Sequence, residues 1–239
     1  MKKIVATAAA AIGLAAAYTV IPTYAIRLSS YGVVQRTDQK GILLTFDDGP
    51  NPTYTPQLLA LLKQYNIRAI FFVVAEKAEK YPEIIHQMIA DGHVIGLHHY
   101  THSDSYKMTP NMLDAELLKG KQAIERVTQQ PVHFYRPPWG KFTLATLPLA
   151  KKHALTPIMW SKIFGDWKVK TCQTTLQNKL HHAVKDGAIY VLHDCGMNPG
   201  ADDEAPAFML QQLEKFLRDT TALGQPFTEP TNWKRYVSH

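Results

Sequence analysis

The chain has little cysteine and no repetition. Only Cys172 and Cys195 occur among the 239 residues, and they are too far apart in the chain to form a local cysteine pair, so a cysteine metal site is not expected. One disulfide is the most that they could form, and the sequence does not supply the distance that would predict it. No internal repeat, low-complexity tract or second domain boundary is present, and the length suits a single core.

A basic stripe is also missing. The formal net charge is +6 and the pI is about 9.2, but the Lys and Arg residues are scattered and do not alternate with aromatic residues. The sequence therefore predicts no nucleic-acid partner. For an exported protein, a basic surface attracts anionic envelope polymers or lipid headgroups. A solvated surface with a mild excess of lysine is the simpler interpretation.

The first 26 residues differ from the rest of the chain. Lys2 and Lys3 precede an uncharged, apolar stretch over residues 4–26. This pattern is typical of an export signal, and Thr23-Tyr24-Ala25 offers a cleavage site. The stretch is also long enough to act as a membrane anchor, so both interpretations stay open. Residues 27–39 are expected to be a linker, and both interpretations place the domain of residues 40–239 outside the cytoplasm.

In that domain, short apolar runs alternate with amphipathic ones. This order predicts an α/β fold with a mainly parallel sheet, open or closed into a barrel. The predicted strands are 42–46, 68–74, 93–97, 132–135, 155–159 and 188–192. The predicted helices are 56–65, 82–90, 112–129, 174–185 and 207–217.

Two adjacent carboxylates, Asp47 and Asp48, end the first predicted strand. The backbone bends at a strand terminus, so both side chains can face one site. A metal ion could hold one carboxylate and leave the other free to act as a base. An ordinary Asp-Asp-Gly-Pro turn is the alternative.

His98 and His102 follow the third predicted strand at a spacing of four. This spacing would put both imidazoles on one face of a helical turn, although a solvated helix face has the same pattern. Together with Asp48 they would form a set of two histidines and one carboxylate that leaves positions for water and substrate. His93 and His99 are not expected to be ligands.

Polar residues also end three later apolar runs. They are found in Arg136-Pro-Pro-Trp-Gly140, in Asp166-Trp167 and in His193-Asp194. Barrels of alternating strands and helices place their chemistry at such strand ends. Any one of these segments is weak evidence, but five in this order and spacing are specific.

The five segments together resemble the motifs of the polysaccharide deacetylases of carbohydrate esterase family four, over about residues 40–230. The motifs stand here as Thr45-Phe-Asp-Asp-Gly-Pro50, His98-x-x-x-His102, Arg136-Pro-Pro-Trp-Gly140, Asp166-Trp167 and Val191-Leu-His-Asp194. The resemblance implies a distorted (β/α) barrel and a metal-dependent hydrolase that removes acetyl groups from N-acetylated sugars in a polymer.

The resemblance also implies roles for single residues. Asp48, His98 and His102 would bind one divalent ion, with zinc expected and cobalt, nickel or manganese able to replace it. Asp47 would take a proton from the attacking water, and His193 would protonate the departing amine. Arg136 would hold Asp47 ionised, and Asp166 would keep His193 protonated. A capped Pro-Pro turn and a helix start are the alternatives for Arg136 and Asp166.

Four further residues are expected to contact the substrate: Trp139, Trp167, Val191 and Leu192. The backbone N–H of Trp139 would donate to the oxyanion, and Trp167 would face the acetyl methyl group. Strand alternation places Val191 on the side of His193. Relatives commonly carry Asn where this chain has Leu97 and Asp where it has Ile163, so the departures from the family pattern concern the surface that contacts the sugar and not the catalytic set.

The expected substrate is N-acetylglucosamine in peptidoglycan, because the domain would face the envelope and carries no carbohydrate-binding module. Chitooligosaccharide or poly-N-acetylglucosamine is the next alternative, and acetylxylan the last. A catalytically silent sugar-binding relative would be expected to lack Asp47 or His193, and both are present. The two histidines disfavour a phosphate-cleaving magnesium enzyme.

Overall fold

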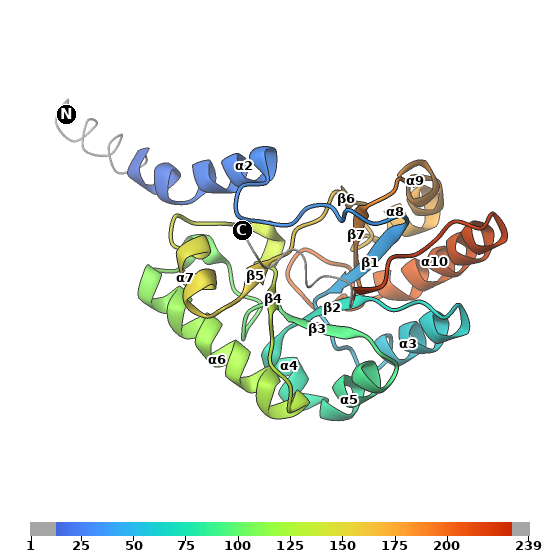
Figure 1. Cartoon of the computed structure of the whole chain (residues 1–239), viewed down its shortest axis with the longest axis horizontal. Coiled ribbons are helices and arrows are strands. Elements are labelled where there is room, and N and C mark those ends of the chain that lie inside the picture. The colour runs from blue at the N-terminus through green and yellow to red at the C-terminus, as the bar shows by residue number, and fades with distance from the viewer. Residues whose placement is uncertain (1–12, 231–239) are drawn as a thin grey trace.

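A curved sheet of seven parallel strands lies at the centre of residues 13–230, the part of the chain that the computed structural model describes (Figure 1). The strand order is β5-β4-β3-β2-β1-β7-β6. The strands are β1 (Ile42–Asp47), β2 (Ile70–Val73), β3 (Val94–Leu97), β4 (Phe134–Tyr135), β5 (Thr156–Pro157), β6 (Lys162–Ile163) and β7 (Ala188–His193). The predicted α/β fold of the distorted-barrel type is confirmed.

Helices cover the outer face of this sheet (Figure 1). They are α3 (Thr55–Gln64), α4 (Ala75–Lys80), α5 (Pro82–Ala90), α6 (Pro110–Thr128), α7 (Thr146–Lys152), α8 (Val169–Thr174), α9 (Leu176–His182) and α10 (Ala205–Ala222). Alternation along β1 sends Ile42, Leu44 and Phe46 into the core between sheet and helices. Leu43 joins a smaller cluster with Ile70, Phe72 and Ile189 on the inner face. The same alternation turns Asp47 inward, because side chains on a strand alternate between its two faces.

The segment before β1 crosses the open side of the sheet. Val34 forms a parallel bridge with Ile158, just after β5, and Arg36 forms an antiparallel bridge with Ala188 at the start of β7. The Val34 N–H donates to the Pro157 carbonyl, and the Thr37 N–H donates to the Gly187 carbonyl. Part of the expected linker therefore pairs with the barrel.

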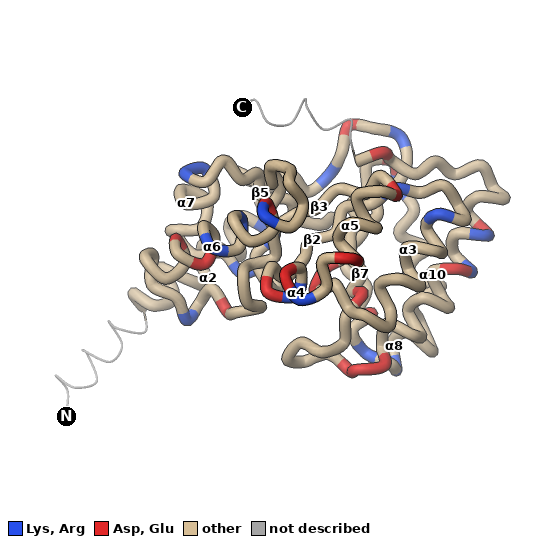
Figure 2. The backbone as a smooth tube through the Cα atoms, turned by 90° about the horizontal axis from the view of Figure 1, so that it is seen from below, with Lys and Arg blue, Asp and Glu red and all other residues tan. Residues whose placement is uncertain are grey.

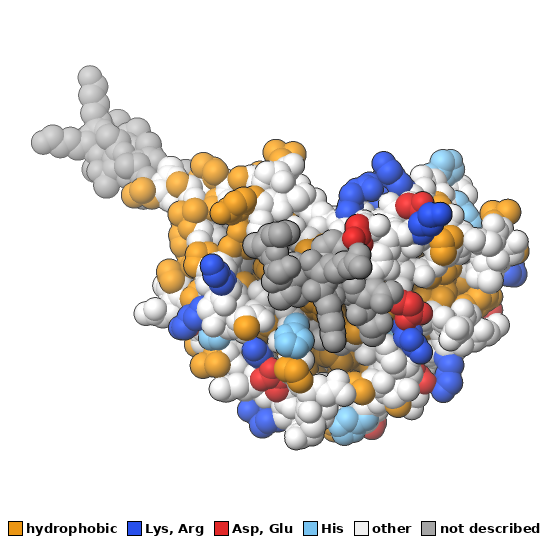
Figure 3. Space-filling model, viewed as in Figure 1, with side chains coloured by type: hydrophobic (Ala, Val, Ile, Leu, Met, Phe, Trp, Pro, Cys, Tyr) orange, Lys and Arg blue, Asp and Glu red, His pale blue; other side chains and the backbone are white. Residues whose placement is uncertain are grey.

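Helix α2 (Val20–Ser29) packs beside this segment (Figure 1). The buried Thr23 hydroxyl donates to the Phe142 carbonyl and accepts from the Phe142 N–H, both at 2.8 Å. Ile26 is buried with Phe142 and Met159. The outer face of the helix stays apolar, and Figure 3 shows hydrophobic side chains gathered over it. Ile21, Tyr24 and Leu28 are among the exposed ones.

Within residues 13–230, no helix is both long and apolar enough to cross a membrane. Membrane attachment through residues 4–26 stays a prediction. Lys2 and Lys3 of the expected export signal lie outside the described residues. Signal cleavage and export stay predictions.

The structure differs from the predicted elements in a few places. The helix predicted at 174–185 is replaced by α8 and α9, because Thr175 leaves helical geometry with φ −131°. Helices α4 and α7 were not predicted, and β6 has only two residues, too few to show an alternating pattern. Cys172 and Cys195 are both free and buried. Lys and Arg positions are dispersed among Asp and Glu along the chain (Figure 2).

Candidate active site

A pocket of about 340 Å³ lies where β1 and β7 end. The predicted site residues that line it are Asp47, Asp48, His98, His102, Trp139, Trp167, Val191 and His193. These side chains come from five segments that are far apart in the sequence. They meet because parallel strands bring their carboxyl ends to one edge of the sheet.

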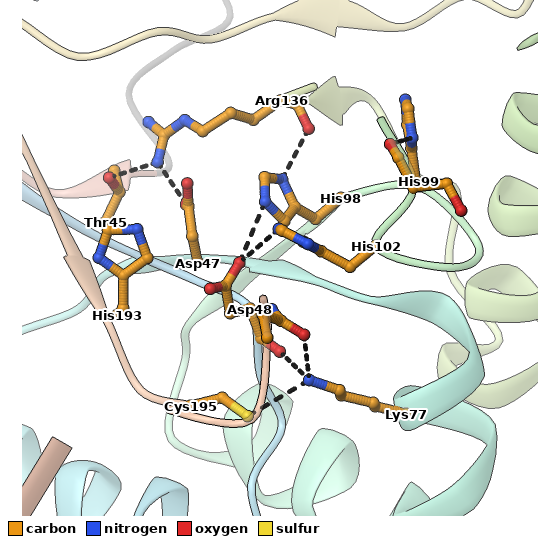
Figure 4. A network of polar contacts seen from close by, with 12 residues as sticks. Thr45, Asp47, Asp48, Lys77, His98, His99, His102, Arg136, His193 and Cys195 are labelled. Atoms are coloured by element: carbon orange, nitrogen blue, oxygen red, sulfur yellow. Dashed lines mark hydrogen bonds and ion pairs between the residues drawn. The ribbon is translucent and has the colours of Figure 1, made fainter. Parts of the chain in front are cut away.

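Asp48, His98 and His102 form one compact group (Figure 4). The Asp48 Oδ1 atom lies 3.3 Å from Nε2 of His98 and 3.0 Å from Nε2 of His102. One ligand atom from each of the three lies within 4.8 Å of the other two. Burial alone would raise the pKa of Asp48, but hydrogen bonds from His102 and His98 hold it well below its usual range. The group is therefore arranged as two imidazole nitrogens around a carboxylate.

The ring of His98 is held in a fixed orientation. Its Nδ1 lies 2.7 Å from the Arg136 carbonyl oxygen, which can only accept, so Nδ1 carries the proton and donates. With a metal bound, a ring protonated at Nδ1 would present its unprotonated Nε2 to the ion, as metal-binding histidines commonly do. Two imidazole nitrogens and one carboxylate suit a divalent ion such as zinc, so the residues present fit a metal.

The helical turn predicted over residues 98–102 is wrong. Both histidines lie in an irregular loop after β3, and His99 has φ +66°, which turns the chain between them. The His99 side chain points away, and its Nε2 lies 2.8 Å from the Tyr135 hydroxyl. Burial lowers the pKa of His99 to about 3. His93 and His99 lie outside the candidate metal group, as predicted.

Arg136 is a fully buried cation that donates four hydrogen bonds. Its Nη1 donates to Asp47 Oδ1 at 2.6 Å and to the Thr45 hydroxyl at 2.8 Å (Figure 4). Its Nε and Nη2 donate to the carbonyls of Ile158 and Met159. Burial lowers the pKa of Arg136, and Asp47 opposes that shift. The geometry matches the predicted pairing of Arg136 with Asp47, since each charge is satisfied by the other.

His193 and Asp166 form the second pair. Asp166 Oδ1 lies 3.1 Å from Nδ1 of His193, and Asp166 Oδ2 accepts from the His193 N–H at 2.7 Å. Burial alone would lower the pKa of His193, but the charge and hydrogen bond of Asp166 raise it to about 10. Because Nδ1 faces Asp166, the Nε2 atom is the one left for the pocket. Register pairs His193 with Asp47 across β7 and β1.

Three of the four expected substrate contacts line the pocket. Trp139 is 38% exposed, and the Trp167 ring stands edge-on to the His193 ring at 5.3 Å. Val191 is on the pocket side, as strand alternation predicts. Leu192 as a substrate contact is a wrong prediction. It is fully buried in the core beneath the helices, because it points to the face of β7 opposite His193.

Several contributors to the site have no signal in the motifs. Arg27, Trp160 and the loop of residues 198–201 also line the pocket. Lys77 donates to the Asp48 carbonyl at 2.9 Å and to Asn198 Oδ1 at 3.2 Å, so it ties the Asp48 turn to that loop (Figure 4). The Gly, Pro and Asn content of residues 196–200 is the one sequence feature that indicates a loop after β7.

Asp194 is a second buried carboxyl group close to the metal group. Its Oδ2 accepts from the Thr55 hydroxyl at 2.5 Å. Burial raises the pKa of Asp194 to about 6, although the bond from Thr55 opposes the shift. Gly49 packs directly on this carboxyl group, where a Cβ atom would clash with it. Asp194 therefore packs against the turn that follows Asp47 and Asp48.

Comparison with known proteins supports the same assignment. A sequence profile described as polysaccharide deacetylase matches residues 34–158. A peptidoglycan-N-acetylglucosamine deacetylase of Bacillus cereus is 34% identical over 180 residues, which cover 74% of this chain and 84% of that protein. A chitooligosaccharide deacetylase of Bradyrhizobium is 36% identical over 184 residues, covering 76% and 81%.

A solved structure agrees with these relatives. The crystal structure of a peptidoglycan N-acetylglucosamine deacetylase superposes with a TM-score of 0.75 at 26% identity, covering 87% of this chain and 94% of that one. The shared profile, relatives and fold identify the protein as a member of the polysaccharide deacetylase family of carbohydrate hydrolases.

Proposed function

We propose that this deacetylase removes acetyl groups from N-acetylglucosamine units of peptidoglycan, outside the cytoplasm. The observation that carries the proposal is the convergence of Asp48, His98 and His102 beside two charge-paired proton carriers, Asp47 and His193. The similarity to the Bacillus cereus enzyme supports peptidoglycan as substrate. The export signal expected in residues 1–26 supports an envelope polymer.

Asp48, His98 and His102 hold the ion in this proposal, with zinc favoured and cobalt, nickel or manganese as replacements. Bound there, a divalent ion would polarise the attacking water and the acetyl carbonyl. The hydrogen bond from His98 Nδ1 to the Arg136 carbonyl fixes the ring so that Nε2 is available.

Asp47 and His193, each paired with an oppositely charged residue, carry out the proton transfers. Asp47 accepts the proton of the attacking water, since its carboxylate is held beside the Arg136 guanidinium. His193, kept protonated by Asp166, gives its Nε2 proton to the amine as the carbon–nitrogen bond breaks. An amine must be protonated to leave, so an acid on this side is required.

Two aromatic residues complete the arrangement. The backbone N–H of Trp139, in a turn with φ +53°, would donate to the developing oxyanion. Trp167 and Val191 line the pocket beside His193 and give the acetyl methyl group an apolar surface. The methyl group therefore lies against these side chains while the carbonyl faces the polar group.

The substrate is tested by mass spectrometry. The metal-loaded protein is incubated separately with peptidoglycan fragments, chitooligomers and acetylxylan, and each product is examined for loss of acetyl groups. We expect the fastest loss from peptidoglycan fragments, at N-acetylglucosamine. Faster deacetylation of chitooligomers would favour the activity named for the Bradyrhizobium relative, and loss from acetylxylan alone would contradict an amide substrate.

A further inference from the structure

Arg27 of α2 belongs to the wall of the active-site pocket, although it lies 20 residues before Asp47. Its Nη2 donates to the Trp139 carbonyl at 2.6 Å and to the Gly140 carbonyl at 3.2 Å. Its guanidinium carbon lies 5.7 Å from the centre of the Trp160 ring. The approach is close, because a Cβ on Gly140 would stand 3.0 Å from Nη2 of Arg27.

In the chain that keeps residues 20–25, helix α2 is fixed to the domain at the point that carries Arg27. The Thr23 hydroxyl exchanges hydrogen bonds with the Phe142 backbone and accepts another from the Tyr106 hydroxyl at 2.7 Å. At the end of the helix, the Gln35 side chain donates to the Arg27 carbonyl at 3.1 Å. These contacts hold the arginine in place from both sides.

The charge of Arg27 is not neutralised within residues 13–230. It forms no ion pair with an Asp or Glu of that range, whereas the neighbouring cation Lys141 is paired with Asp104 at 2.6 Å. Both recorded hydrogen bonds of the side chain start from Nη2, which leaves Nε and Nη1 as donors. The two acidic groups of the pocket are engaged elsewhere, Asp47 with Arg136 and Asp48 with the two histidines.

We propose that Arg27 recognises a carboxylate on the glycan, on a group next to the acetylated sugar in the pocket. A guanidinium with free donors at the edge of a pocket suits a carboxylate better than a neutral hydroxyl. The proposal rests on the proposed function and sharpens it, since it selects acetylated polymers that carry acid groups over neutral ones such as chitin oligomers. Arg27 is then a specificity residue, supplied by a helix outside the barrel.

We expect Arg27 to lower KM modestly for the acidic substrate relative to the neutral one. Exposed ion pairs contribute about 0.2 to 1 kcal/mol, which corresponds to about a 1.5- to 5-fold preference for the acidic substrate. Because Arg27 is exposed, added salt should reduce the preference.

The test uses the full-length, metal-loaded protein and two substrates that differ only in charge. One is an acetylated glycan fragment with a free carboxyl group, and the other is the same fragment with that group converted to its methyl amide. Acetate release gives kcat and KM for each. The wild type should show the lower KM on the acid, Arg27→Gln should lose this difference, and Arg27→Lys should keep most of it. Arg218→Gln, an exposed site on α10, removes the same charge elsewhere and should change nothing.

Two results would overturn the proposal. Equal KM values of the wild type on both fragments would show that the carboxylate is not read. An equal fall of kcat on both fragments in Arg27→Gln and Arg27→Lys would instead make Arg27 a positioning residue for the Trp139 turn. Neither result contradicts the proposed deacetylase function. That function is contradicted only if the wild type releases acetate from none of the acetylated glycans.

Discussion

The two sides of the pocket are built in different ways. On the strand-end side, Asp47 and His193 sit at the ends of paired strands, and the ladder between β1 and β7 sets their separation. On the α2 side, Arg27 and Thr23 are held by hydrogen bonds from side chains to backbone groups that lie more than one hundred residues away. In the proposed mechanism the first side carries out the chemistry, and the second side, which is attached to it, selects the substrate.

The sharpest test of the strand-end side is removal of a metal ligand. His102→Ala should abolish both metal binding and deacetylation, because only two ligands would remain in the group. Metal content by atomic emission and acetate release check both losses. His86→Ala, on the exposed face of α5, is the matched control and should alter neither. A variant at His102 that still carries a full equivalent of metal would remove this residue from the set.

The next largest effect is expected when the general base, Asp47, is replaced. Asp47→Asn should retain metal and lose about 10²- to 10⁴-fold in kcat, because an amide cannot accept the proton of water. The measurement is kcat at saturating substrate, together with metal content. The variant also leaves Arg136 without its counter-charge, so a lower melting temperature is expected. Near-normal turnover would show that another group is the base.

The general acid, His193, can be distinguished from the general base, Asp47, because only the effect of the acid depends on how easily the leaving group departs. His193→Ala should retain metal and lose far more activity on an N-acetyl amide than on an activated acetyl ester, since a good leaving group needs less protonation. Comparison of kcat/KM on the two substrates checks this. A loss of the same size on both would argue against His193 as the general acid.

The role of Asp166 beside His193 is tested by the dependence of activity on pH. The pKa of His193 is raised to about 10 mainly by Asp166, so the acid is protonated below that value and activity falls as pH rises through it. Asp166→Asn removes the charge, lowers this pKa and should move the basic limb of the pH–rate profile down by about 1 to 3 units. An unmoved limb, with only a lower melting temperature, would mean that Asp166 has a structural role.

The smallest effect is expected on the α2 side. Thr23→Val removes the hydroxyl that satisfies the Phe142 N–H and carbonyl, so stability should fall by about 1 to 3 kcal/mol. Deacetylation should fall only slightly, because the catalytic groups do not depend on this bond. Denaturant unfolding and kcat/KM are the measurements. Unchanged stability would show that α2 is not docked as described, and the contrast between the two sides would then disappear.

The sequence predicts the strand-end side well for a physical reason. A strand end, a turn and a polar residue are adjacent in the chain, so Asp47, His98, Arg136 and His193 each follow a recognisable apolar run. Parallel pairing then brings these ends together without further information. The loop conformation at His99 was missed because a positive φ at a non-glycine residue has no reliable sequence signal.

The α2 side could not be predicted in this way. An uncharged, apolar N-terminal stretch has the same composition whether it is an export signal or a docked helix, and only its partners distinguish them. Thr23 meets Phe142 through tertiary contacts 119 residues away, and Arg27 meets Trp139 across 112. No local pattern records such pairs. Leu192 is wrongly predicted to contact the substrate because its motif, Val191-Leu-His-Asp194, runs along a strand and therefore includes side chains of both faces.

The crossing segment before β1 has a consequence for the order of folding. One edge of β1 pairs with β2, which follows soon after it in the chain, but the Thr45 hydroxyl donates to the Tyr190 carbonyl 145 residues away and Arg36 pairs with Ala188. Closing such long loops is entropically costly and slow. On the ribosome, the second edge of β1 and the segment before it therefore lack their partners until β7 has emerged. A chain stopped before residue 188 lacks Val191 and His193, so its pocket is incomplete.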